Sequence, residues 1–311
     1  MQVVVVGAGI SGLLAARHLS SAGHEVVVLD KGRSSGGRCA TRRVGDAVFD
    51  HGAQFFTVRS DDFAQLVNDW LSAGVVREWC RGFGTRDGHP RYCGVAGMTS
   101  ITKHLAASLD VRYSKLVFNL ERRDAGWRVR LDDGTFIDAD RVVLTCPIPQ
   151  SMALLVNTEI NVPDAIRTIE YDKTIAALVA VTGTTALPEP GGIQNADETF
   201  SFIGDNHRKG ISAIGALTFH CSPTFSEEHW WNDATVTHET VMQLAQPWLG
   251  GATIVEHQPK RWRMATPRTT WHERCWSAEG VVLAGDAFAG PKIEGAALSG
   301  LAAAQRLLES A

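Results

Sequence analysis

Three glycines and an aspartate near the N-terminus have the types and the spacing of a turn that binds phosphate groups. Gly7, Gly9 and Gly12 follow a run of four valines, and Asp30 ends a second apolar run. In such a turn the first glycine allows the tight bend, the second lets a pyrophosphate approach the backbone, and the third permits close helix packing. Asp30 can accept hydrogen bonds from ribose hydroxyls. The segment predicts a βαβ unit that binds an adenine dinucleotide; the alternative is a strand, turn and helix that bind nothing.

A second acidic residue at the end of a predicted strand, Asp286, lies near the C-terminus. It follows the apolar run 281–285, and a helix of small residues is predicted to begin near Glu294. Asp286 is placed to bind the hydroxyls of a ribityl chain, and the positive end of the helix dipole favours negative charge on a flavin ring. These features favour a flavin over a nicotinamide as the bound cofactor. An ordinary helix cap is the alternative role for Asp286.

The elements that must position these residues mix strands and helices. A strand–helix–strand unit is predicted over 2–30, short strands over 75–95 and a β-meander over 111–141. Helices are predicted over 60–74, 97–109, 226–248 and 295–308, and further strands over 142–145, 174–182, 199–203, 211–219 and 281–286. We expect an α/β fold with a discontinuous, Rossmann-like dinucleotide-binding domain formed by 1–55, 95–150 and 265–311. A second, α+β substrate domain is expected from 56–94 and 151–264.

Composition and charge exclude several classes of partner. The net charge of −4 gives no general attraction to nucleic acid or to an anionic membrane. The six cysteines are scattered, without a CxxC pair or metal-ligand spacing, which favours reduced thiols and no metal site. We find no signal peptide pattern and no apolar run of about 18 residues, the length of a membrane span. We therefore expect a cytoplasmic protein.

Short motifs spread along the chain resemble those of the flavin-containing amine oxidase superfamily. They are Gly7–Gly12, Asp30-Lys31, Gly36-Gly37-Arg38, Asp50–Gln54, Gly285-Asp286 and Glu294–Gly300. Within that superfamily the chain is most similar to the renalase family in its short bacterial form. The short length, the run Asp50–Phe56 and the run Lys260–Ala265 before the final flavin motif carry this second resemblance. Both resemblances are strong at the two ends of the chain and patchy across 150–255.

The resemblance implies a p-hydroxybenzoate-hydroxylase-like fold that binds FAD without a covalent bond, because the matching stretch 287–291 lacks the cysteine that attaches flavin elsewhere in the superfamily. It assigns the pyrophosphate to one group of residues near the N-terminus: Gly7, Gly9, Ile10, Ser11, Gly12, Gly37 and Arg38. It assigns the adenosine to Asp30, Lys31 and Val117. It places Ala53, Gln54 and Phe55 near the isoalloxazine, with Asp286, Ile293 and Glu294 from the C-terminal motif.

The same resemblance implies oxidation of NADH and NADPH isomers that carry the hydride on the wrong ring carbon, namely 2-dihydro or 6-dihydro NAD(P). Dioxygen then reoxidises the flavin and yields hydrogen peroxide. Such a substrate needs positioning rather than a strong base. The candidates for positioning it are Gln54, Trp262, Arg263, His220 and Asn206. Core packing for the tryptophan and histidine, and a solvated surface for the arginine, are the alternatives.

Three other functions remain open from the sequence. The chain could be another FAD-dependent enzyme of the superfamily, such as an amine oxidase, a porphyrinogen oxidase or a carotenoid desaturase. It could bind flavin without turnover, as a sensor. A plain NAD-dependent dehydrogenase would explain Gly7–Gly12 and Asp30 but would leave Gly36-Gly37-Arg38 and Gly285-Asp286 without a role.

Overall fold

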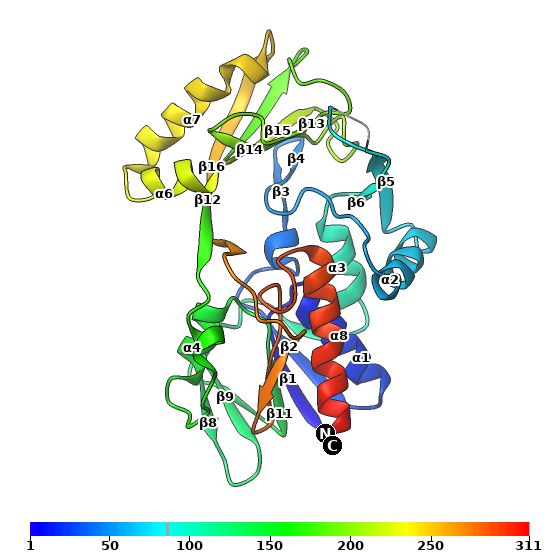
Figure 1. Cartoon of the computed structure of the whole chain (residues 1–311), viewed down its shortest axis with the longest axis vertical. Helices are drawn as coiled ribbons and strands as arrows, with labels where there is room; N and C mark the ends of the chain where they lie inside the picture. Colours follow the sequence, from blue (N-terminus) through cyan, green and yellow to red (C-terminus); the bar gives the residue numbers. More distant parts are fainter. Residues whose placement is uncertain (85–86, 311) are drawn as a thin grey trace.

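The computed structural model describes residues 1–84 and 87–310, and its lower half in Figure 1 is built on a six-stranded sheet. The strand order is β17-β18-β11-β1-β2-β7. Five strands run parallel: β1 (Gln2–Val6), β2 (Glu25–Leu29), β7 (Asp110–Arg112), β11 (Arg141–Leu144) and β18 (Val281–Leu283). The edge strand β17 (Trp276–Ala278) is antiparallel. Segments from both ends of the chain and from its middle therefore meet in one sheet, and the two termini lie close together.

Both faces of the central strands of this sheet are buried, which is why β1, β11 and β18 consist almost entirely of apolar residues. Val3 and Val5 face a helical layer, and Val4 and Val6 face the opposite core. The helical layer contains α1 (Ile10–Ser21), α3 (Thr99–Ala106) and α8 (Ile293–Glu309). The opposite face packs against α4 (Ile148–Leu155), α5 (Asp164–Arg167) and the small sheet of β8 (Val117–Arg122), β9 (Trp127–Leu131) and β10 (Phe136–Ala139). Residues 160–169 thus share a core with the six-stranded sheet.

The upper half is a five-stranded antiparallel sheet in the order β13-β14-β15-β12-β16 (Figure 1). Its strands are β12 (Tyr171–Thr182), β13 (Gly192–Gln194), β14 (Phe200–Asp205), β15 (Gly215–Cys221) and β16 (Thr253–Pro267). The helices α6 (Pro223–His229) and α7 (Ala234–Leu249) cover its outer face. Its inner face contacts the hairpin of β3 (Thr41–Val44) and β4 (Ala47–Asp50), which rises from the lower half.

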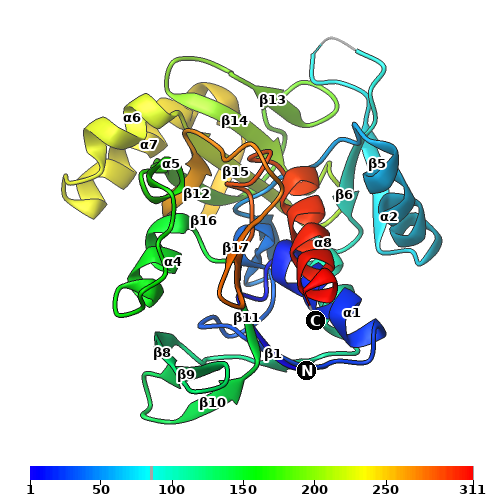
Figure 2. The ribbon, with the colours of Figure 1, turned by 60° about the horizontal axis from the view of Figure 1, so that its bottom comes forward.

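A third group of elements lies beside the helical layer, as Figure 2 shows. It comprises α2 (Asp61–Ser72), β5 (Val76–Cys80) and β6 (Arg91–Gly94), and a short 3-10 turn at Gly37–Cys39 leads into β3. Phe63, Val67 and Trp70 of α2 pack into the same core as α1 and α8. The segment 56–94, which the sequence assigns to the substrate domain, is therefore also joined to the dinucleotide-binding half.

Several elements differ from those expected, and two of these differences have a clear local reason. The helix predicted over 226–248 is two helices, because Asp233 caps a new N-terminus by accepting hydrogen bonds from the N–H groups of Thr235 and Val236. The strand β16 was not expected over its full length, since charged and half-exposed residues interrupt its apolar pattern. Over residues 1–84 and 87–310, none of the helices combines the length and the hydrophobicity that crossing a membrane requires.

Candidate active site

A deep cleft of about 1650 Å³ lies between the two sheets. It runs from Lys31 and Val117, beyond the carboxyl ends of the parallel strands, to His220 and Trp262 on the five-stranded sheet. Ligand pockets for small molecules are commonly about 300–1,000 Å³. The cleft therefore has room for a ligand larger than a typical small molecule, or for two ligands in contact.

The N-terminus of α1 opens into this cleft with the properties of an anion site. Gly7 has a φ of +112°, which favours glycine, and a Cβ on Gly12 would lie 2.0 Å from the Gly7 carbonyl oxygen. A Cβ on Gly9 would meet nothing within 4 Å, so the space beside it is open. The first turn of the helix has no acid, and within residues 1–84 and 87–310 no side chain caps the helix and the buried Ser11 hydroxyl has no partner. The unpartnered donors favour a phosphate here.

One end of the cleft is formed where β2 ends. The Asp30 carboxylate accepts hydrogen bonds from the N–H groups of Ala8 and Gly32, each at 2.6 Å. A carboxylate has about four lone-pair positions, so ribose hydroxyls can still donate to Asp30. Lys31 and Val117, which the sequence assigns to the adenosine, also line this end, and Lys31 donates to Gln150 at 3.2 Å.

The middle of the cleft is crossed by a bidentate ion pair between Arg38 and Asp286. The two guanidinium–carboxylate distances are 2.5 and 2.7 Å, and Asp286 is 7% exposed. The sequence assigns each residue to the cofactor separately, and the structure brings them together. Beside them, Ile293 and Glu294 begin α8, and the Glu294 carboxylate accepts hydrogen bonds from the N–H of Arg59 and the hydroxyl of Ser60.

The roof of the cleft is the inner face of the five-stranded sheet. In its register His220 lies opposite Ala176, which lies opposite Lys260, so these three residues share one face. Trp262 pairs with Thr174 in the next row. The register then slips between Thr174 and Asp172, and this bulge brings consecutive residues of β16 to the cleft: Trp262, Arg263, Met264, Ala265 and Thr266.

His51 links this roof to the strand below it. Its carbonyl accepts hydrogen bonds from Trp262 Nε1 at 2.7 Å and from His220 Nε2 at 3.2 Å. Its ring stacks on Trp262, with the centroids 5.2 Å apart and the planes 14° apart. Burial lowers the pKa of His220 to about 4, and burial followed by the nearby charge of Lys260 lowers the pKa of His51 to about 3. Both histidines are therefore neutral at pH 7.

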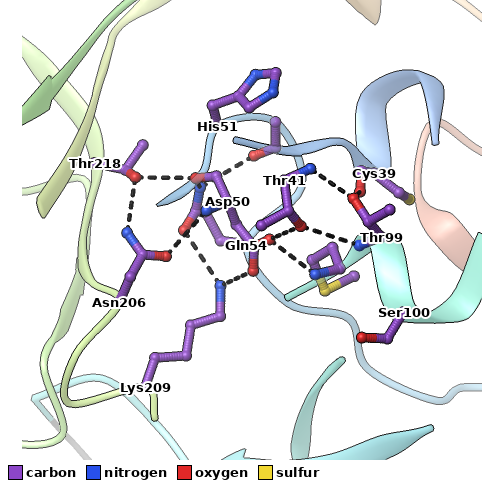
Figure 3. A network of polar contacts seen from close by, with 12 residues as sticks. Cys39, Thr41, Asp50, His51, Gln54, Thr99, Ser100, Asn206, Lys209 and Thr218 are labelled. Carbon is purple, nitrogen blue, oxygen red and sulfur yellow. Dashed lines mark hydrogen bonds and ion pairs between the residues drawn. The ribbon is translucent and has the colours of Figure 1, made fainter. Parts of the chain in front are cut away.

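Gln54 and Asn206, two of the residues expected to meet flavin or substrate, do not line the cleft (Figure 3). They are 5% and 0% exposed, and their amides bind the backbone of Asp50 at the end of β4. The expectation for these two residues has to be revised, because their donors and acceptors are used inside the protein. The flanking Ala53 and Phe55 do line the cleft.

Lys209, which was not among the candidate residues of the sequence analysis, lies in the same network (Figure 3). Its ammonium is 2.6 Å from Asp50 Oδ2, and both side chains are fully buried. The other carboxylate oxygen of Asp50 accepts hydrogen bonds from the Thr41 hydroxyl and the Met98 N–H. Asp50 was visible in the motif Asp50–Gln54, but nothing in the local pattern around Lys209 indicates that its side chain is buried.

Comparisons with known proteins agree on one enzyme family. Residues 79–308 match the flavin containing amine oxidoreductase family, and residues 5–70 match an NAD(P)-binding Rossmann-like domain. Mouse renalase is 27% identical over 167 residues, 49% of each chain. An L-amino-acid oxidase from Gloydius halys is 61% identical over 41 residues, 13% of this chain and 8% of the relative. The chain therefore aligns with about half of the first relative and a small part of the second.

Solved structures show the same fold over the whole chain. A putrescine oxidase superimposes with a TM-score of 0.72 at 16% identity, covering 99% of both chains. An oxidoreductase from Methanosarcina mazei gives 0.69 at 15% identity, covering 99% of this chain and all of the other. At this level of identity the likeness concerns the fold alone.

Proposed function

The chain belongs to the flavin containing amine oxidoreductase family, its cofactor is FAD, and within that family we propose that it oxidises misreduced NAD(P)H. The substrates would be the 2-dihydro or 6-dihydro isomers, the products NAD(P)⁺ and hydrogen peroxide, and the second substrate dioxygen. The half-length match to mouse renalase and the motifs Asp50–Phe56 and Lys260–Ala265 support this choice.

The residues along the cleft fit FAD. The uncapped N-terminus of α1 and the unpartnered Ser11 hydroxyl would hold its pyrophosphate, and Asp30 would bind the adenosine ribose. Arg38 and Asp286 reach the middle of the cleft, where the ribityl chain would lie. When bound, FAD supplies the hydride acceptor and the route for two electrons to dioxygen.

The charge distribution in the cleft is the observation that carries the choice of substrate. Its only acidic lining residues in the described chain are Asp30 at one end and Asp286 and Glu294 in the middle, so none belongs to the roof end. The opposite end presents the cations of Arg42, Lys260 and Arg263 beside an aromatic stack. An ammonium substrate would be repelled there, whereas an anionic dinucleotide with a flat ring would be attracted.

The protonation states also suit this substrate. A dihydropyridine releases hydride with the help of its own ring nitrogen, so the protein need not remove a proton. His51 and His220 are neutral at pH 7, and the carbonyl and ring of His51 fix the orientation of Trp262. We infer that the roof residues orient the nicotinamide ring and exclude water, and that they take no proton from the substrate.

Anaerobic mixing tests the proposal directly. The FAD-loaded protein is mixed with a borohydride-generated mixture of NADH isomers while the flavin absorbance in the visible range is followed. We expect rapid bleaching by a minor isomer, followed by recovery of the colour and release of peroxide when air is admitted. Pure 4-dihydro NADH and a panel of amines are the controls.

The control reactions separate the alternatives. Bleaching by an amine but not by the dihydro isomers would refute the proposal and make the chain an amine oxidase. Bleaching by neither, with FAD bound, would refute it in favour of another small substrate. Separate assays of the purified isomers then identify whether 2-dihydro or 6-dihydro NAD(P) is preferred.

A further inference from the structure

Two of the cations at the roof end of the cleft, Lys260 and Arg42, lie close to its aromatic stack and have no acidic partner in the part of the chain that the structure describes. Lys260 comes from β16 and Arg42 from β3, so strands of different sheets place them in the same cleft. The Lys260 ammonium lies 4.7 Å from the centroid of the Trp262 ring. Among residues 1–84 and 87–310, neither cation takes part in an ion pair.

The fields of these two cations overlap. Burial, and then the charge of Arg42, lowers the pKa of Lys260. Both charges also act on His51, whose buried Nδ1 has no hydrogen-bond partner. Like charges that are held together without a counterion destabilise each other, and an anion between them removes that repulsion.

We propose that Arg42 and Lys260 form a subsite for the phosphates of the substrate dinucleotide. This subsite rests on the proposed function and specifies how that substrate is held. The ring of the substrate would face the stack of His51 and Trp262, and its phosphate-bearing arm would cross Trp262 toward Lys260. The planar guanidinium of Arg42 and the compact ammonium of Lys260 are both suited to phosphate oxygens.

This subsite is distinct from the phosphate position of the cofactor. The cofactor pyrophosphate belongs at the N-terminus of α1, beyond the carboxyl edge of the parallel sheet. Lys260 instead lies on the five-stranded sheet, in the same row as His220. FAD bound at α1 would occupy the phosphate position of the cofactor, so titration of the FAD-loaded protein tests ADP binding away from that position.

Calorimetric titration of the oxidised, FAD-loaded protein with ADP tests the subsite without turnover. Lys260→Met keeps an apolar cover on Trp262, and Arg42→Gln keeps a hydrogen-bonding group. Loss of a charge-assisted contact should weaken ADP binding by about tenfold or more in each variant. Lys103→Met, an exposed position on α3 outside the cleft, is the matched control and should bind ADP like the wild type.

Two further readings distinguish a phosphate contact from a general structural effect. The affinity for ADP should fall with ionic strength in the wild type and less steeply in Lys260→Met. In both variants KM for the dihydro-NAD isomer should rise far more than KM for dihydronicotinamide riboside, which has no phosphate; an equal rise for the two substrates would contradict a phosphate contact. FAD content measured alongside confirms that each variant is folded.

The results for ADP binding and for turnover show separately whether the subsite and the proposed substrate are correct. Weaker ADP binding in both variants without any turnover of dihydro isomers would retain the subsite and refute the proposed substrate. Normal turnover with ADP affinity unchanged in the variants would overturn the subsite alone. Failure of the wild-type protein to bind ADP would also overturn it.

Discussion

Replacing Lys209 with methionine should destabilise the protein strongly, because it leaves the carboxylate of Asp50 buried without its counterion. The two side chains are fully buried, and the ammonium lies 2.6 Å from the carboxylate. The pair joins the end of β4 to the loop after β14, so it connects the two halves of the molecule (Figure 3). Methionine has a similar length, which limits the loss of packing.

The expected loss in the free energy of unfolding depends on the hydrogen bonds that Asp50 retains in the variant. Removing one partner of a buried ion pair costs about 3–5 kcal/mol. Thr41 and Met98 still donate to Asp50 in the variant, so we expect a loss near the lower limit, about 3 kcal/mol. The double variant Asp50→Asn, Lys209→Met leaves no unpaired buried charge at this position and should recover most of this loss, because an uncharged pair avoids the desolvation cost.

Urea unfolding of the FAD-saturated protein, followed by far-UV circular dichroism, gives the apparent free energies of unfolding of the wild type and of these two variants. Lys103→Met, with the same chemical change at an exposed site, should stay within about 0.5 kcal/mol of the wild type. A cost below about 1 kcal/mol for Lys209→Met would refute the reasoning, because a surface-like value means that the pair is not buried in solution. A double variant less stable than Lys209→Met would contradict the charge argument.

Two further predictions concern the cofactor and the pH dependence. Asp286→Ala leaves Arg38 without its ion-pair partner in the cleft and should lower the FAD content of the purified protein; full retention would contradict the role assigned to Asp286. Burial lowers the pKa of His220 from 6.5 to about 4. As the pH falls, this imidazole is therefore protonated in the unfolded chain before it is protonated in the folded protein. Stability should therefore fall as the pH drops from 6.5 toward 4. His220→Gln should flatten that part of a pH series of urea curves, and an unchanged slope would contradict the buried, neutral state.

The dinucleotide-binding half was predictable because its signals are local. The valines of β1, the turn at Gly7–Gly12 and the start of α1 lie within one short segment, and each has a physical requirement that the sequence displays. The same holds for β18 and the start of α8. The cofactor residues of these motifs line the cleft, except for Gly12, whose part is close packing against Gly7.

The roof of the cleft could not be derived from local pattern. Its residues are brought together by the register of β15, β12 and β16, in which His220 and Lys260 share a row although they are far apart in sequence. A bulge in β16 then changes which side chains face inward, so simple alternation fails there. Gln54 was misplaced for a related reason, because its motif indicates a position near the cleft but does not say which way the side chain points.

The carbonyl of His51 explains why the buried network matters for the site. Asp50 is held by Lys209 and precedes His51 in the chain, and the His51 carbonyl accepts hydrogen bonds from both Trp262 and His220. A displacement of β4 would therefore also displace the roof, because His51 follows Asp50 directly in the chain. A loss of the ion pair that shifted β4 would move the aromatic stack relative to the cofactor end of the cleft. In Lys209→Met we therefore expect substrate binding to weaken at temperatures where the protein is still folded.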